Sequence, residues 1–401
     1  MIRPARFLAV ALLWLLVASS AAVSRDAAAT ASVVPFELIG NHIYVPIEAR
    51  GTAGGPVQTM RFVFDSGATA LLTPQAAHAL GLEPHGDVPM RGSGEDVEHG
   101  QRTRVAALRL GSATLNDVRA GVLSLPAAVT ELGSGPPVGG LIGQEFLRRY
   151  VVKIDYVNRL LTLASPSEFV TPTAGRAIPC TINGGMPVVS AELDGRTGTF
   201  VIDTGNSTSI ALLTPYVERE HLREFYASHV HRILGRGVGG YFHGDAARAA
   251  SFVIGGFALH DQIVDLSSQR AGFFASTSVD GNLGTGVLRN FTVTLDYPHR
   301  MVYLDPDLVF DAPPSFDRSG MYLERDGEDF RVVEAMSDAP AGEAGLEAGD
   351  RIVEIDGKPA RDYLAARIGE TLSGPAGRKL ALEVVHGTSP RSVVLVLRNL
   401  I

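Results

Sequence analysis

The stretch FVFDSG at residues 62–67 decides the fold of this chain, because it recurs as FVIDTG at residues 200–205. Each copy is an apolar run that leads directly into Asp, a small hydroxyl residue and Gly. The apolar run is typical of a buried strand, and the Gly lets the backbone turn so that an N–H group approaches the carboxylate. The hydroxyl beside each Asp is placed to hydrogen-bond locally. We therefore expect Asp65 and Asp203 on equivalent loops, each at the end of a buried strand.

The repeat extends well beyond these two stretches. GLIGQEFLRRYVVKIDY at residues 140–156 matches GNLGTGVLRNFTVTLDY at residues 281–297, at an offset of 141 residues against 138 for the first pair. An insertion of three residues in one loop reconciles the two offsets. Residues 36–165 and 178–306 are thus predicted to be two copies of one fold, joined by a linker at residues 166–177.

Local patterns predict elements within the first copy. Apolar runs and alternations of strand length predict strands at residues 43–48, 60–64, 105–110 and 151–155. Thr73 and Pro74 predict a short helix over residues 74–80, with Thr73 as its N-cap. Residues 23–35 are Ala-rich and without period, so we expect no regular element there.

Composition places the chain among globular proteins and argues against several functions. Hydrophobic residues make up 45% and charged residues 19% of the sequence, which is typical of a folded chain. The formal net charge of −8 gives no indication of nucleic-acid binding. The single cysteine, Cys180, excludes an intramolecular disulfide and a zinc site built on cysteines.

The N-terminus predicts export. Arg3 and Arg6 precede an apolar run at residues 7–18, and small residues follow it. This order is typical of a signal peptide, so we predict a signal over residues 1–22 and a periplasmic or secreted mature protein. An uncleaved membrane anchor is the alternative, because the apolar segment approaches the length needed to cross a bilayer.

A third domain follows a proline-rich boundary at residues 306–319. The run SDAPAGEAGLEAGD at residues 337–350 and a hairpin turn at Asp356-Gly357 distinguish it. We expect strands at residues 322–324, 330–333, 352–355, 380–385 and 392–397, and helices at residues 339–344 and 362–372.

The two Asp loops, followed by LIG at residues 141–143 and NLG at residues 282–284, resemble those of the retropepsin-like aspartic peptidases. The whole chain is similar to bacterial aspartyl protease family proteins that also carry a PDZ domain. The resemblance implies a mainly β fold, with two closed β-barrel lobes related by pseudo-two-fold symmetry and a C-terminal α+β PDZ domain over residues 318–401. It also implies a cleft between the lobes, with a water held between Asp65 and Asp203.

A two-fold arrangement of the lobes would bring Asp65 and Asp203 face to face. Like charges that close cannot both ionise, so the pair shares one proton. One Asp is then a base and the other an acid at the same pH, as hydrolysis of a peptide by water requires. The predicted function is an exported aspartic-type endopeptidase that acts as a monomer and needs no metal or cofactor. The residues predicted to orient the two carboxylates are Ser66, Gly67, Thr204 and Gly205.

Two glycine-rich segments, residues 92–100 and 235–244, are predicted to be flaps over the cleft. Tyr241 in the second segment is the candidate for a contact with a bound peptide. The same segment fits a G-x-G-x-x-G pattern from Gly235 to Gly240. No helix is expected after it, so the sequence argues against a dinucleotide site.

PDZ domains bind extended peptides by adding a strand to a sheet edge. By resemblance, the carboxylate-binding turn of this domain is Gly320-Met321-Tyr322-Leu323. We expect peptide tails to bind at this turn, and protein or peptide substrates to bind in the cleft.

Two departures in the second copy keep another function open. Asn206 stands where the family usually has Ala or Ser, and Asn282 interrupts the second hydrophobic-hydrophobic-Gly segment. A catalytically inactive peptide-binding or adaptor protein on the same scaffold would tolerate both changes. A dyad assembled from two chains is a further alternative, which is disfavoured because both Asp loops lie in one chain.

Overall fold

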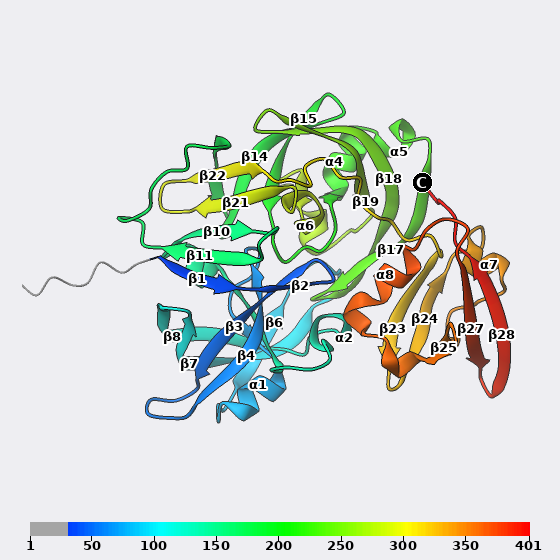
Figure 1. Ribbon diagram of the computed structural model, residues 1–401, viewed down its shortest axis with the longest axis horizontal. Helices are drawn as coiled ribbons and strands as arrows, with labels where there is room; N and C mark the ends of the chain where they lie inside the picture. Colours follow the sequence, from blue (N-terminus) through cyan, green and yellow to red (C-terminus); the bar gives the residue numbers. More distant parts are fainter. Residues whose placement is uncertain (1–30) are drawn as a thin grey trace, which may run out of the picture. The chain divides into compact units, whose positions relative to one another are not determined.

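The computed structural model describes residues 31–401, and this part of the chain is mainly β, as the sequence predicts (Figure 1). The predicted signal peptide, residues 1–22, lies outside the described residues. Within residues 31–401, no helix is both long enough and apolar enough to cross a membrane.

The first lobe is an eight-stranded sheet in which six strands close into a ring. Its elements are β2 (Glu37–Ile39), β3 (His42–Arg50), β4 (Val57–Asp65), β5 (Leu71–Leu72), α1 (Pro74–Ala79), β6 (His85–Met90), β7 (Glu98–Leu110), β8 (Ala113–Val122), α2 (Ala127–Thr130), β9 (Val138–Gly143) and α3 (Gln144–Leu147). The hydrogen-bonded order β3-β4-β9-β5-β8-β7 closes on itself because β7 also pairs with β3. The strands predicted at residues 43–48, 60–64 and 105–110 lie within β3, β4 and β7, and the predicted closed barrel is confirmed.

The predicted helix near residue 74 is confirmed as α1. The Thr73 side chain accepts a hydrogen bond from the backbone N–H of Ala76 at 3.1 Å, and Pro74 occupies the first turn, where no N–H partner is needed. The strand-to-helix boundary is therefore encoded locally by these two residues.

The second lobe repeats this architecture. Its elements are β13 (Thr181–Asn183), β14 (Met186–Leu193), β15 (Arg196–Ile202), β16 (Ile210–Leu212), α4 (Thr214–Arg219), α5 (Leu222–Phe225), β17 (His229–Gly237), β18 (Gly240–Ile254), β19 (Phe257–Ser267), η1 (Phe273–Ala275), β20 (Gly281–Leu283) and α6 (Thr285–Leu288). The ring β14-β15-β20-β16-β19-β18 closes through a pairing of β14 with β18. The sequence repeat is thus a repeat of three-dimensional structure.

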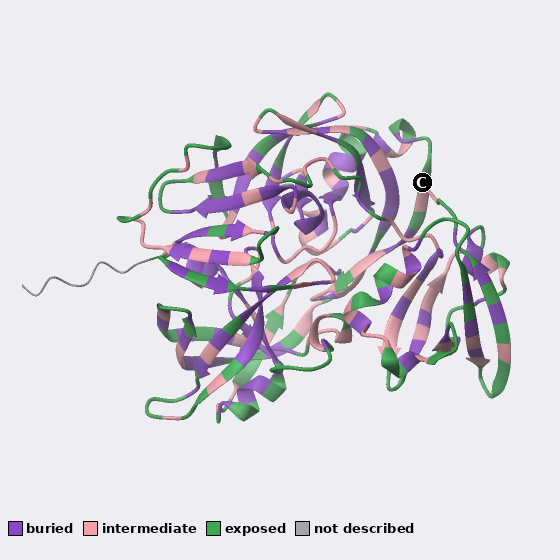
Figure 2. Ribbon diagram, in the orientation of Figure 1, coloured by how far each residue is buried: buried purple, intermediate pink, exposed green. Residues whose placement is uncertain are grey.

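The two lobes share a six-stranded sheet in the order β1-β11-β10-β21-β22-β12. Its strands are β1 (Ser32–Pro35), β10 (Val151–Asp155), β11 (Leu160–Ala164), β12 (Arg176–Pro179), β21 (Phe291–Asp296) and β22 (Met301–Pro306). Antiparallel pairing of β10 with β21 joins a hairpin from each lobe, and Figure 1 shows these strands side by side. One continuous apolar core runs through both lobes, and buried residues are coloured purple along the strands in Figure 2.

The sequence predicts no regular element over residues 23–35, and this prediction is wrong for the last residues of that segment. Residues 32–35 form β1, which pairs with β11 at the edge of the shared sheet. Backbone hydrogen bonds to a distant strand and the burial of Val34 stabilise β1, and neither is visible in the local pattern.

The C-terminal domain is a sheet of six strands with short helices. Its elements are β23 (Met321–Asp326), β24 (Asp329–Ala335), α7 (Pro340–Glu343), β25 (Arg351–Ile355), β26 (Lys358–Pro359), η2 (Ala360–Asp362), η3 (Ala365–Arg367), α8 (Ile368–Leu372), β27 (Lys379–His386) and β28 (Ser389–Val396). The strands pair in the order β23-β24-β25-β27-β28, with β26 beside β25, so β23 is an edge strand. Its apolar core is separate from the core of the two lobes.

The prediction of a single helix over residues 362–372 is wrong. The chain forms two 3₁₀ turns and then α8, because Tyr363 and Leu364 are extended. The Tyr363 hydroxyl donates to the carbonyl of Ile355 at 2.8 Å, which holds the segment against β25. A tertiary contact therefore overrides the local helical pattern.

Candidate active site

Each predicted Asp lies where a central strand of its lobe ends. Asp65 is the last residue of β4, and Asp203 directly follows β15. The backbone N–H of Gly67 donates to Asp65 Oδ1 at 2.8 Å, and that of Gly205 donates to Asp203 Oδ1 at 3.0 Å. Both loops therefore turn back so that the glycine N–H orients the carboxylate, the geometry expected from the sequence.

A second strand supports each loop from behind. β9 runs parallel to β4, with Phe64 beside Ile142, and β20 runs parallel to β15, with Ile202 beside Leu283. These are the segments that follow each Asp loop in the sequence repeat. The pairing fixes the end of the central strand, and with it the position of the carboxylate.

The hydroxyl residues of the two loops bond across to each other. Ser66 Oγ donates to the carbonyl of Ile202 at 2.9 Å, and Thr204 Oγ1 donates to the carbonyl of Phe64 at 2.7 Å. The backbone N–H groups bond across in the same way. The N–H of Ser66 donates to Thr204 Oγ1, and the N–H of Thr204 donates to Ser66 Oγ, each at 3.0 Å. Both side chains are fully buried. Ser66 and Thr204 thus orient the carboxylates indirectly, by locking the opposite loop.

The two glycines bring the carboxylates together. A Cβ atom added to Gly67 would lie 2.8 Å from Asp203 Oδ1, and one added to Gly205 would overlap the carboxyl group of Asp65. Each carboxylate therefore lies directly against the glycine of the other loop. Burial, followed by the nearby Asp203 carboxylate, raises the pKa of Asp65 well above its ordinary value.

The two departures of the second lobe lie beside this pair. Asn282, which is 3% exposed, donates from Nδ2 to Asp203 Oδ2 at 2.7 Å. Asn206 donates in turn to Asn282 Oδ1 at 2.8 Å. Both residues therefore make polar contacts that reach the Asp203 carboxylate, and no sequence pattern had linked them to it.

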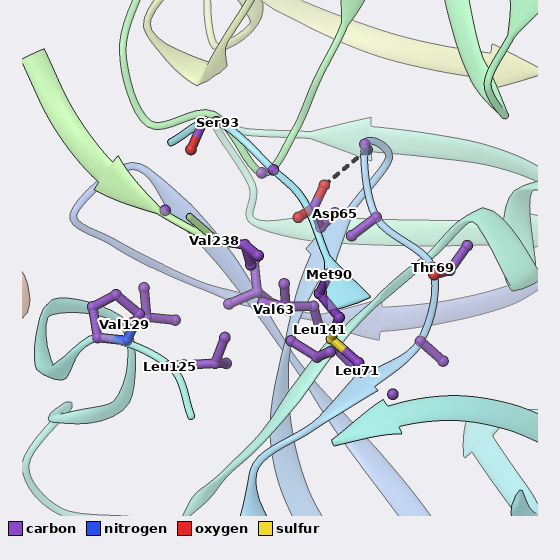
Figure 3. Close-up of a pocket in the computed structure, with 18 of the residues that line it drawn as sticks. Val63, Asp65, Thr69, Leu71, Met90, Ser93, Leu125, Val129, Leu141 and Val238 are labelled. Atoms are coloured by element: carbon purple, nitrogen blue, oxygen red, sulfur yellow. Dashed lines mark hydrogen bonds between the residues drawn. The ribbon is translucent and has the colours of Figure 1, made fainter. Parts of the chain in front are cut away.

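A cleft of about 1890 Å³ opens at the dyad. Its apolar residues include Val63, Leu71, Met90 and Leu141, and Figure 3 shows their side chains in the pocket beside Asp65. They come from four different strands, β4, β5, β6 and β9. The cleft therefore offers apolar side chains next to two polar reacting groups, as peptide-binding sites commonly do.

The two predicted flaps meet at their tips. The N–H of Gly94 donates to the carbonyl of Val238, and the N–H of Asp96 donates to the carbonyl of Gly239, each at 3.0 Å. Val238 lines the cleft, so it is a functional candidate that the sequence analysis missed (Figure 3). Its only sequence signal is its place in a glycine-rich turn.

Tyr241 does not reach over the dyad. Its hydroxyl donates to Glu324 of the C-terminal domain at 2.6 Å, and its ring lies 5.9 Å from that of Tyr322. Tyr241 thus links the second flap to strand β23. Tyr241 is not among the residues that line the cleft.

The predicted peptide-binding turn of the C-terminal domain leads into β23. Gly320 has φ of +73°, a conformation that favours glycine, and Met321 is buried beneath the turn. Tyr322 and Leu323 line the same cleft as Asp65. Helix α2 of the first lobe packs on the core of this domain through Ala127. This edge strand therefore faces the peptidase lobes.

Residues 31–401 contain no cluster of three or more side chains of the types that bind metal ions. Polar and charged side chains also line the cleft around the two carboxylates, among them His42, Glu98 and Arg102. Two adjacent carboxyl groups can accept and donate protons.

Residues 48–146 match the aspartyl protease family, and residues 331–386 match the PDZ domain family. The chain therefore carries an aspartyl protease domain and a C-terminal PDZ domain. The second lobe lies outside the first match, and its assignment rests on the repeat and on the site geometry.

Two solved structures are similar to parts of the chain. An aspartic proteinase from Irpex lacteus is 14% identical, with a TM-score of 0.46, and the match covers 71% of this chain and 99% of that one. The photosystem II D1 C-terminal processing protease is 25% identical, with a TM-score of 0.19, over 20% of this chain and 23% of that one. A search of curated proteins found no significant match.

Proposed function

We propose that this protein is an aspartic-type endopeptidase in which Asp65 and Asp203 activate a water molecule. The observation that carries the proposal is the reciprocal lock of Ser66 and Thr204, which holds the two carboxylates against each other's loop. Such a pair shares one proton at intermediate pH. It therefore presents a base and an acid to the same bound peptide.

In the reaction, the ionised carboxylate accepts a proton as the water oxygen attacks the scissile carbonyl carbon. The protonated carboxyl gives its proton to the carbonyl oxygen, and a neutral tetrahedral intermediate results. The carboxyl that took the proton from water then gives it to the leaving nitrogen. The other carboxylate takes a proton back from a hydroxyl of the intermediate as the C=O bond re-forms and the C–N bond breaks. The apolar cleft wall and the joined flap tips would hold the peptide and keep out other water.

The location and the PDZ domain belong to the same proposal. The N-terminal sequence supports export to the periplasm or beyond, where the substrates would be proteins or peptides. PDZ domains bind extended peptides at a sheet edge, and here the edge strand β23 lines the peptidase cleft. The PDZ domain would therefore dock the part of a long substrate that extends beyond the dyad.

The test is cleavage of a mixed peptide library by residues 23–401 between about pH 3 and 8. The wild type should cut with a bell-shaped pH profile, and Asp65→Asn and Asp203→Asn should each be inactive. A chelator should have no effect. Activity that survives in Asp203→Asn would contradict a dyad within one chain. Peptide binding without any cleavage would support the adaptor alternative.

A further inference from the structure

A chain of hydrogen bonds, unused by the mechanism above, ends on Asp203. Thr208 donates to Asn206 Oδ1 twice, from its backbone N–H at 2.9 Å and from its hydroxyl at 3.0 Å. Asn206 Nδ2 donates to Asn282 Oδ1 at 2.8 Å, and Asn282 Nδ2 donates to Asp203 Oδ2 at 2.7 Å. These hydrogen bonds therefore connect a backbone donor to Oδ2 of the Asp203 carboxylate.

The direction of this chain is fixed at its first link. A backbone N–H can only donate, so the side-chain oxygen of Asn206 faces Thr208 and its amide nitrogen faces away. Asn282 must then accept with its oxygen, and it turns its N–H toward Asp203. The network itself thus assigns the orientation of both amides.

The first lobe has no such donor. The repeat places Leu141 at the position of Asn282 and Ala68 at the position of Asn206. The donors on Asp65 are the backbone N–H groups of its own loop, whereas Asp203 accepts from Gly205 at Oδ1 and from Asn282 at Oδ2. A carboxylate that accepts on both oxygens is stabilised in its ionised form.

We propose that Asn282 is a positioning residue that keeps Asp203 ionised and leaves the shared proton of the dyad on Asp65. The inference rests on the proposed peptidase function and assigns the two roles within it. Asp203 takes the proton from water as the O–C bond forms. Asp65 gives its proton to the carbonyl oxygen as the C=O π bond breaks.

The electrostatics of the dyad agree with a proton shared between its two carboxyl groups. Burial, and then the charge of Asp203, raise the pKa of Asp65 well above its ordinary value. The other titratable or charged groups around the dyad and its hydrogen-bond chain include His42, Arg148, Tyr297, Cys180, Asp265 and Arg232.

These groups do not reverse the assignment. Burial raises the pKa of Tyr297, so Tyr297 is neutral over the whole pH range of the assay. Burial lowers the pKa of His42 to about 4, so His42 gains charge on the acidic limb, and it does so in the wild type and in the variants alike. The positive charge of Arg148 acts on the nearby Tyr297, where it lowers the pKa. Burial raises the pKa of Asp265 to about 7, and this carboxyl contacts the Thr208 hydroxyl. The Thr208 backbone N–H still donates to Asn206 in either state of Asp265, so the direction of the chain is unchanged.

The decisive experiment compares the pH dependence of kcat/KM in the wild type, Asn282→Leu and Asn206→Ala, which give the second lobe the residues of the first. In Asn282→Leu the ionised dyad lacks the hydrogen bond from the amide, so it forms less readily. The acidic limb of the profile should therefore move to higher pH by about one unit. At the acidic end, kcat/KM should fall about tenfold. Asn206→Ala should move the limb in the same direction, and adding it to Asn282→Leu should have little further effect.

Asn158→Leu is the matched control. Asn158 makes a similar amide-to-carboxylate bond, to Asp155 at 2.9 Å, on an exposed turn outside the cleft. Its pH profile should coincide with that of the wild type. Thermal unfolding of all variants checks that they are folded at the pH of the assay.

Titration of ¹³C-labelled aspartate carboxyls by NMR gives a readout that needs no turnover. The first ionisation of the dyad should occur at higher pH in Asn282→Leu than in the wild type. Equal titration curves, or an unmoved acidic limb, would overturn the role of Asn282 while leaving the peptidase intact. A wild type that cleaves nothing would remove the proposed function, and the NMR titration would still decide where the proton lies.

Discussion

The interlock of the two Asp loops can be tested by Thr204→Val, which keeps the shape of the side chain and removes the hydroxyl. The hydroxyl accepts from Ser66 N–H and donates to the Phe64 carbonyl, and the site is fully buried. The substitution leaves both partners without a bond in a place that water does not reach. Each buried unsatisfied group costs about 1–3 kcal/mol, so loss of both bonds should lower the free energy of unfolding by about 2–6 kcal/mol.

The assay is urea unfolding at neutral pH, followed by far-ultraviolet circular dichroism. Thr214→Val is the matched control. The Thr214 hydroxyl is also buried, but it makes one bond, to Ser267 Oγ at 3.1 Å, and Ser267 keeps a second partner in the N–H of Gln269. The control should therefore lose about 1 kcal/mol or less.

Activity should follow stability in this pair of variants. Thr204→Val releases the carbonyl that precedes Asp65, so kcat should fall under conditions in which the variant is still folded. Thr214→Val should keep its activity, because Thr214 contacts neither Asp loop. If Thr204→Val unfolds at the same urea concentration as the wild type, the hydroxyl does not lock the loops and the reasoning fails.

Three further predictions follow from single contacts. Gly205→Ala should abolish cleavage, because the added Cβ would overlap the carboxyl group of the opposite loop. Gly369→Ala is the control, since a Cβ there meets open space, and it should cleave peptides as the wild type does in the same assay. Burial raises the pKa of Asp350, but its hydrogen bonds outweigh this and hold the pKa below the ordinary value, so its stabilising effect is present at neutral pH and is lost as the pH falls below about 4. Asp350→Asn should therefore reduce the unfolding temperature at pH 7 more than at pH 3, and equal losses would contradict this. Thr73→Ala should lower the free energy of unfolding by about 1 kcal/mol, through loss of the cap on Ala76, and Thr73→Ser should restore most of it in urea unfolding.

The two asparagines of the second lobe show how a departure from a pattern can mislead. In sequence terms, Asn206 and Asn282 suggested a degenerate lobe. In the structure, Asn282 donates to Asp203 and Asn206 orients Asn282. A polar residue in an apolar segment is costly unless it is hydrogen-bonded, and here the reacting carboxylate is its partner.

The C-terminal domain shows a similar limit. Its hairpin turn and most of its strands follow from local patterns, and the structure contains them. The direction in which Tyr241 points was predicted from the flap alone. Because Glu324 and Tyr322 offer it a hydrogen bond and a ring contact, its side chain turns to the C-terminal domain.

The sequence by itself determined the features that depend on neighbouring residues. Strand periodicity, the glycine turn after each Asp, the Thr73 cap and the internal repeat all act over short distances, and the repeat required two equivalent lobes. Only the tertiary structure decided the features that join distant segments. These include the exchange between Ser66 and Thr204, which lie 138 residues apart, the pairing of β1 with β11, and the amide of Asn282 on Asp203. Each of these contacts depends on how two lobes or strands dock, and docking is set by the packing of the whole core rather than by any local pattern.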